Sequence, residues 1–129
     1  MPIRWAVKTA GFVSLRDTKF DNGIFKRYYG LFSGVIVIRG FKSKVTEAVF
    51  NGLCPKGFPV QIFPVARRKL EALEAAEQLN DLRVPPGNRL ETLTKDRRGQ
   101  HSIRINDQWR VCFRWTKDGP MDVEIVDYH

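Results

Sequence analysis

The sequence predicts a two-layer α+β domain in which two helices pack on one face of a curled, mainly antiparallel sheet of about four to five strands. Three observations lead to this expectation: a β-branched run near residue 35, two segments with helical spacing of apolar residues, and several short strand-like segments after them. The chain has 129 residues, enough for one domain with a modest core.

The predicted domain opens with a short strand and a helix. Residues 1–34 show no sustained apolar period, whereas residues 35–38 form a β-branched run that is typical of a strand. In residues 41–50 the apolar side chains recur at near-helical spacing, and the Asn51-Gly52 pair that follows is expected to end the helix.

The second predicted helix covers residues 65–79, after a loop at residues 52–64 that contains three prolines. One face is expected to be buried, because apolar residues form a stripe at Ala66, Leu70, Leu73 and position 76 or 77. The remaining charged residues predict a solvated face, to which we assign Glu71 and Glu74. Residues 84–88 hold two adjacent prolines and predict a sharp break.

Four short strands are predicted next, at residues 89–93, 101–106, 108–115 and 123–128. An odd-length loop between the second and third of them places Arg104 opposite Arg110, because an even loop would bury the wrong side chains. Two arginines directly across a ladder repel each other. The pair is tolerated if both share an anion such as an RNA phosphate, or if both extend into water, and the sequence leaves both explanations open.

The chain is strongly basic, with 22 Lys and Arg against 14 Asp and Glu, a net charge of +8 and a pI near 9.9. A small basic domain is attracted to polyanions, and nucleic acid is the first candidate. Between Lys95 and Arg114 there are six basic and two acidic residues, so the positive charge is concentrated locally.

The cysteines and the hydropathy pattern lead us to expect a cytoplasmic protein without a membrane partner. Cys54 and Cys112 share no metal spacing, and Cys112 lies in an apolar run that suits a buried thiol. No apolar stretch approaches the ~20 residues of a membrane-spanning helix, and residues 1–34 lack the features of a secretory signal. A Gly-rich phosphate loop and a zinc constellation are both missing, so we expect neither cofactor nor metal.

The last third of the chain combines the side chains needed to cut RNA without a metal. When the 2′-hydroxyl attacks its own phosphate, a site must accept a proton, stabilise a dianionic phosphorane and protonate the leaving 5′-oxygen. Arginine grips phosphate bidentately, so Arg104 and Arg110 are candidates for the phosphorane. The candidates for proton transfer are Glu91, His101, Asp127, Tyr128 and His129. The RNA is expected to bind at Lys95, Arg97, Arg98, His101, Arg104 and Arg114.

Residues 88–93, residues 96–113 and the terminal Val-Glu-Ile-Val-Asp-Tyr-His together resemble the HigB branch of the RelE/ParE toxin superfamily. The resemblance runs from about residue 37 to residue 129. It implies a RelE-like fold and a toxin of a type II toxin–antitoxin pair that cuts mRNA in the ribosomal A site, in contact with 16S rRNA. It also implies a neutralising HigA-type helix-turn-helix antitoxin, and operator DNA bound only through the toxin–antitoxin complex.

The catalytic roles that this resemblance implies fall on Arg110, Asp127, Tyr128 and His129. Its basic turn corresponds to Lys95, Arg97 and Arg98. The chain departs from the family at Glu91, where some HigB toxins have a catalytic histidine. Glu91 could replace that histidine as general base, His101 could assist, or the toxin could be slow, and the sequence leaves these alternatives open.

Two other functions compete with the nuclease. One is a non-enzymatic, ParE-like inhibitor of DNA gyrase, and the other is a module that acts only as corepressor with its antitoxin. The proton-transfer groups near Arg110 favour the nuclease, because a pure binder needs no such groups.

Residues 1–36 have no counterpart in the resemblance, so we expect an N-terminal extension before a toxin domain at residues 37–129. The extension is expected either to be poorly ordered or to be translated upstream sequence, since the Val37-Ile38-Arg39 run resembles the start of such toxins and valine can mark a GTG start codon. Intact-mass spectrometry of the protein from its native operon tests the second explanation, which a mass near 14.9 kDa would exclude.

Overall fold

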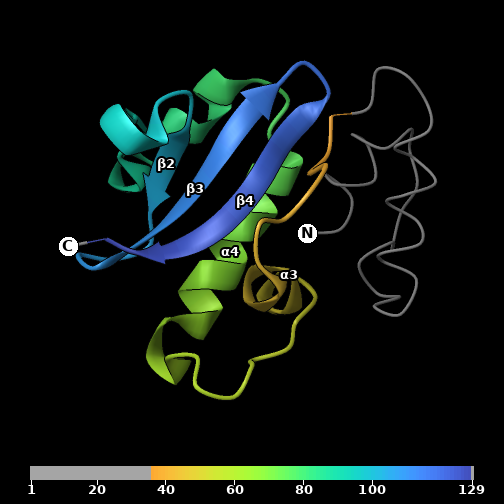
Figure 1. Ribbon diagram of the computed structural model, residues 1–129, viewed down its shortest axis with the longest axis vertical. Helices are drawn as coiled ribbons and strands as arrows, with labels where there is room; N and C mark the ends of the chain where they lie inside the picture. Colours follow the sequence, from red (N-terminus) through yellow and green to blue (C-terminus); the bar gives the residue numbers. More distant parts are fainter. Residues whose placement is uncertain (1–35, 129) are drawn as a thin grey trace.

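In the part of the chain that the structure describes, two α-helices and four antiparallel strands form two layers (Figure 1). The computed structural model describes residues 36–128. The helices are α3 (Lys44–Phe50) and α4 (Phe63–Ala75), and the strands are β1 (Glu91–Thr92), β2 (His101–Arg104), β3 (Trp109–Thr116) and β4 (Gly119–Asp127). Each strand pairs with its neighbour in the chain, in the order β1-β2-β3-β4. The predicted α+β fold is confirmed.

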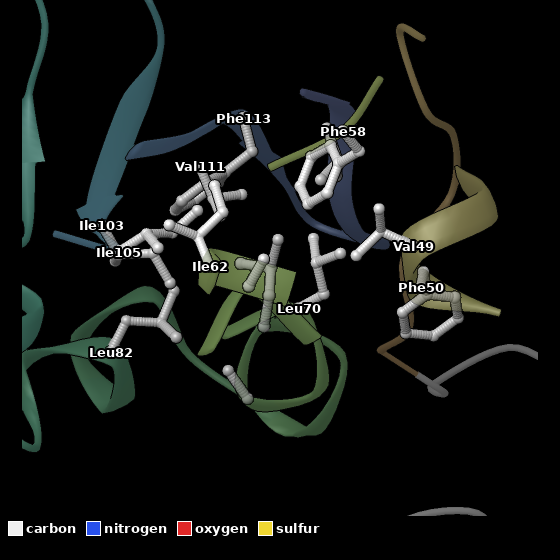
Figure 2. Packing of buried hydrophobic residues seen from close by; sticks show 14 residues of the cluster. Val49, Phe50, Phe58, Ile62, Leu70, Leu82, Ile103, Ile105, Val111 and Phe113 are labelled. Atoms are coloured by element: carbon white, nitrogen blue, oxygen red, sulfur yellow. The ribbon is translucent and has the colours of Figure 1, made fainter. Parts of the chain in front are cut away.

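The core lies between α4 and the sheet (Figure 2). The predicted stripe of α4 is fully buried at Ala66, Leu70 and Leu73, and the sheet buries Ile103, Val111 and Phe113 against it. The predicted register is also confirmed, because Arg104 pairs with Arg110 across β2 and β3. This register follows from burial, since a slip of one residue would turn Val111 and Phe113 away from α4.

The expected N-terminal strand does not form. Residues 36–40 run beside β4: the Gly40 carbonyl accepts the backbone N–H of Val123, and the Pro120 carbonyl accepts that of Arg39. The only bridge, however, is a single parallel one between Phe41 and Val123 in this part of the described chain. The reason lies at Ile38, whose backbone N–H is donated to Glu74 Oε1 of α4 at 2.8 Å instead of to a strand. The rest of the expected extension, residues 1–35, lies outside the described residues.

The helix boundaries differ from those predicted because capping decides them. Helix α3 begins at Lys44, not residue 41, since Ser43 Oγ accepts the backbone N–H of Thr46 at 3.0 Å. Helix α4 ends at Ala75, not residue 79, because Asp81 accepts the backbone N–H groups of Glu77 and Gln78 and starts a new 3₁₀ turn. The 3₁₀ helices are Val60–Ile62, Leu79–Arg83, Pro86–Asn88 and Lys95–Arg97.

The prediction that Glu71 and Glu74 both lie on the solvated face of α4 is wrong for Glu74. It is only 2% exposed, and its carboxylate lies under the segment at Ile38. Glu71, one turn earlier, is half-buried and lies 3.5 Å from Arg67. Glu71 therefore lies on the solvated face predicted from the helical periodicity. Glu74 does not, because residues 36–40 cover it.

We expect Glu74→Ala to lower the free energy of unfolding by about 1–3 kcal/mol, because it leaves the partly buried N–H of Ile38 without its acceptor. Glu71→Ala is the matched control on the same helix, and its half-exposed ion pair with Arg67 predicts a change below about 1 kcal/mol. Urea unfolding of both variants measures the difference. Equal losses in the two variants would contradict the role given to Glu74.

Candidate active site

Side chains from neighbouring strands gather on the face of the sheet opposite the helices. Glu91 pairs with Ser102, and Arg104 pairs with Arg110. Residues paired across a ladder point to the same face, and alternate residues of a strand point to opposite faces. Because Ile103 is buried in the helical core, these polar residues lie on the other face, which we call the outer face.

Arg110, the second residue of β3, lies on the outer face and is held in a fixed orientation. Its side chain is 10% exposed. Its Nε donates to Ser102 Oγ at 2.7 Å, and its Nη2 donates to the Arg89 carbonyl at 2.6 Å. Among residues 36–128, no acceptor takes a hydrogen bond from Nη1. The guanidinium is thus anchored by two of its nitrogens and offers the third to a ligand.

Glu91 and Tyr128 stand over this guanidinium. Glu91 Oε1 is 3.8 Å from Arg110 Nη2, and the Glu91 side chain is 54% exposed. The Tyr128 ring centroid is 5.9 Å from the Arg110 Cζ atom, a cation–π distance. Tyr128 is placed by its backbone N–H, which donates to the Gln108 carbonyl at 2.6 Å. The structure therefore brings together a buried cation, an exposed carboxylate and a phenol from three separate stretches.

Asp127, another terminal candidate, does not join this group. Asp127 pairs across the ladder with Trp109, and its carboxylate accepts Gln108 Nε2 at 3.0 Å. His129 lies outside the described residues. The Asp127 carboxylate thus lies at the turn between β2 and β3, and its pairing with Trp109 puts it on the helix side of the sheet.

Neither explanation that the sequence left open for Arg104 and Arg110, a shared anion or two solvated side chains, describes the pair. Arg110 turns inward to Ser102 and Arg89, while Arg104 forms an ion pair with the exposed Asp107. Neither a shared anion nor two solvated side chains is needed, because each guanidinium has its own acceptors.

The basic turn lies beside the sheet and is held by contacts on both sides. Arg97 Nη1 is 3.5 Å from Glu124 Oε1 of β4 and donates to Gln100 Oε1 at 3.2 Å. Arg114 Nη1 donates to the Arg98 carbonyl at 3.5 Å, and its Nε lies 3.5 Å from Asp122. The side chains of this turn are exposed at Lys95 and Arg98.

His101 is not brought to Arg110. It pairs with Phe113, whose side chain is buried in the helical core, so His101 lies on the helix side of the sheet. Its Nδ1 is 3.2 Å from Thr92 Oγ1, and the centroid of its ring is 5.9 Å from that of the Phe113 ring. Burial lowers the pKa of His101, which favours the neutral ring at pH 7.

Cys112 is buried on the outer face between Ser102 and Glu124, and Cys54 is exposed. Burial raises the pKa of the Cys112 thiol, so the thiol stays protonated at neutral pH. Within residues 36–128, no group of His, Cys, Asp or Glu is arranged to hold a metal. The same part of the chain contains no helix long and apolar enough to cross a membrane.

Sequence reasoning missed the residues that hold Arg110. Ser102 is fully buried although polar, and its alternation with Ile103 was a usable signal, because a serine on the same face as Arg110 can accept from it. Asn88 is also fully buried, but it follows two prolines and a glycine and reads as an ordinary turn residue. The Arg89 carbonyl carries no signal in the sequence.

Comparison with known proteins identifies the family. The RelE-like toxins of the type II toxin–antitoxin system HigB match residues 39–129. The chain belongs to the HigB-like toxin family. Toxin HigB-1 of Vibrio cholerae is 54% identical over 94 residues, covering 69% of this chain and 94% of that protein. Endoribonuclease HigB of Proteus vulgaris is 27% identical over 93 residues, covering 72% of this chain and all of that protein.

An uncharacterized protein of Haemophilus influenzae is 40% identical over 57 residues, covering 44% of this chain and 56% of that protein. The family match spans every element from α3 to β4 and includes Glu91, Arg110 and Tyr128. As a HigB-like toxin of a type II system, the chain has an antitoxin as its partner.

Proposed function

We propose that this HigB-like toxin is a ribosome-dependent endoribonuclease that cuts mRNA by attack of a 2′-hydroxyl on the adjacent phosphate. The observation that carries the proposal is the convergence of Arg110, Glu91 and Tyr128 on the outer face. An anchored guanidinium binds the charge that develops on a phosphorane, and the carboxylate and phenol are groups that transfer protons. Similarity to the Proteus vulgaris endoribonuclease supports it.

Arg110 stabilises the phosphorane through Nη1, the nitrogen that neither Ser102 nor Arg89 engages. Glu91 accepts the proton of the 2′-hydroxyl, because its carboxylate is exposed beside Arg110 whereas His101 lies on the other side of the sheet. The 2′-oxygen bonds to phosphorus and the bond to the 5′-oxygen breaks. The products are a 2′,3′-cyclic phosphate and a 5′-hydroxyl.

The leaving 5′-oxygen takes its proton from Tyr128 or His129. Tyr128 is 38% exposed and its ring lies 5.9 Å from Arg110 Cζ, so a substrate bound at Arg110 can reach this residue. Asp127 orients the terminal segment through Gln108. These roles place the acid on the terminal segment and the base on β1, two segments that meet at Arg110.

The basic residues around the site bind the flanking RNA. Exposed Lys95 and Arg98, with Arg97, Arg104 and Arg114, supply the positive charge that mRNA and 16S rRNA phosphates require. The partners that follow are mRNA in the ribosomal A site and a HigA-type helix-turn-helix antitoxin. Operator DNA is bound only through the antitoxin complex, and the protein acts in the cytoplasm, where the ribosome is.

Mapping of mRNA 5′ ends after induction of the chain without its antitoxin tests the proposal. In-frame cuts with 5′-hydroxyl ends are expected on translated messages, and a matched message without its start codon should stay intact. Intact messages together with DNA breaks would contradict the proposal and indicate inhibition of DNA gyrase instead. Intact messages and intact DNA would leave corepression as the function.

A further inference from the structure

We propose that Asn88 is a positioning residue for Arg110: it fixes the turn that presents the Arg89 carbonyl to the guanidinium. The inference rests on the proposed function of Arg110, but the contacts that carry it belong to a different part of the molecule. They connect α4 and the 3₁₀ helix Leu79–Arg83 to the outer face of the sheet.

Asn88 is fully buried, and its amide is completely engaged. Its Nδ2 donates to the carbonyls of Leu82 at 3.0 Å and Val84 at 3.3 Å, and its Oδ1 accepts Lys69 Nζ from α4 at 2.6 Å. A lysine amine carries hydrogens toward its partner, so the amide oxygen must face Lys69 and the NH₂ must face the two carbonyls. The orientation of the amide is therefore determined by its neighbours.

The next residue has an uncommon backbone conformation. Arg89 has φ 46° and ψ 58°, in the left-handed region that a residue with a Cβ adopts only when its surroundings impose it. Its N–H donates to the Pro86 carbonyl at 3.0 Å, and its own carbonyl accepts Arg110 Nη2 at 2.6 Å. Asn88, bonded to three neighbouring groups, is the residue that holds the chain at this point.

The consequence for Arg110 is geometric. With Nε bonded to Ser102 and Nη2 bonded to the Arg89 carbonyl, the guanidinium plane cannot rotate, and Nη1 keeps one direction. If the Arg89 carbonyl moves, Nη2 keeps only the long 3.4 Å hydrogen bond to the Ser102 carbonyl and the 3.8 Å ion pair with Glu91, so rotation about the Nε–Cζ bond becomes easier. Small displacements of a group that acts on the transition state lower the rate of chemistry more than substrate binding.

The test compares the full chain with its Asn88→Ala variant. We expect single-turnover cleavage of ribosome-bound mRNA to slow by about 10- to 100-fold, with the half-saturating ribosome concentration changed by less than about 3-fold. The matched control is Asn80→Ala, an exposed asparagine whose Oδ1 accepts Arg83 Nε at 2.7 Å, and its rate should equal that of the unmodified chain.

A spectroscopic measurement separates positioning from general loss of structure. In ¹⁵N NMR of the free protein, the Arg110 Nη groups should rotate slowly in the unmodified chain and in Asn80→Ala, and faster in Asn88→Ala. Lys69→Met replaces a half-buried lysine of α4 by an apolar side chain of similar length and removes the donor to Oδ1, so it should remain folded and shift both measurements in the same direction by a smaller factor.

Unchanged cleavage and unchanged Arg110 rotation in folded Asn88→Ala would overturn the inference. If that variant does not fold, unchanged values in Lys69→Met would overturn it instead. The outcome is distinguishable from failure of the proposed function, in which Arg110→Ala would cleave like the unmodified chain while the NMR comparison still decides whether Asn88 fixes the guanidinium.

Discussion

Arg110→Ala is expected to abolish growth inhibition and to slow mRNA cleavage by about 10²- to 10³-fold, the loss typical of removing one preorganised donor to a developing oxyanion. The expectation follows from the position of the guanidinium, which is anchored by Ser102 and Arg89 and directs Nη1 away from them. The measurements are colony formation after induction and single-turnover cleavage on purified ribosomes.

Two further variants make the result specific. Arg110→Lys keeps the positive charge but loses the planar donor group, so it should recover little of the rate. Arg83→Ala removes the same charge from an exposed position on a 3₁₀ helix and should cleave like the unmodified chain. Antitoxin binding by the Arg110 variants should be unchanged, which also shows that they are folded. Growth arrest by folded Arg110→Ala would refute the assignment of Arg110.

The layers of the fold could be predicted because they depend on burial periodicity. The stripe at Ala66, Leu70 and Leu73 sets which side of α4 meets the sheet. The loop after Arg104 sets the register of β2 and β3, since only one register buries Val111 and Phe113. These features follow from local patterns of apolar residues, and the burial that the patterns predict does not depend on contacts with distant segments of the chain.

The elements that could not be predicted depend on contacts between distant residues. Glu74 is buried because residues 36–40 cross over it, and the expected strand there is lost because Ile38 bonds to Glu74. The two errors have one cause, a contact between residues 36 apart in the chain. Helical periodicity alone cannot reveal that a separate segment covers one position of the wheel.

The candidate site shows the same division. Alternation along β2 predicts that Ser102 and Arg104 share a face, and the same alternation puts His101 with Phe113 on the other face. The supporting shell of Arg110 could not be predicted, because the Arg89 carbonyl acts through backbone geometry and Asn88 through a buried amide. Reactive residues can thus be recognised from the chemistry of their side chains. The groups that hold them in place are harder to recognise from the sequence.

Deletion of Tyr128 and His129 is expected to abolish growth inhibition as well, with cleavage slowed by about 10²- to 10⁴-fold through loss of general acid catalysis. The deletion begins after the last residue of β4, Asp127, so the sheet remains. It removes the ring over Arg110 and one backbone hydrogen bond to Gln108, which predicts a stability loss of only about 1 kcal/mol.

Single substitutions assign the loss to one of the two residues. Tyr128→Phe keeps the ring against Arg110 and removes the hydroxyl, whereas His129→Gln removes the imidazole and leaves Tyr128 in place. If Tyr128 is the acid, the first variant alone should match the deletion; if His129 is the acid, the second should. Cleavage is measured on purified ribosomes, with antitoxin binding as the folding control. Growth arrest by both the truncated chain and Arg110→Ala would remove the basis for a nuclease at this face, because neither the anchored cation nor the terminal proton donors would then be needed.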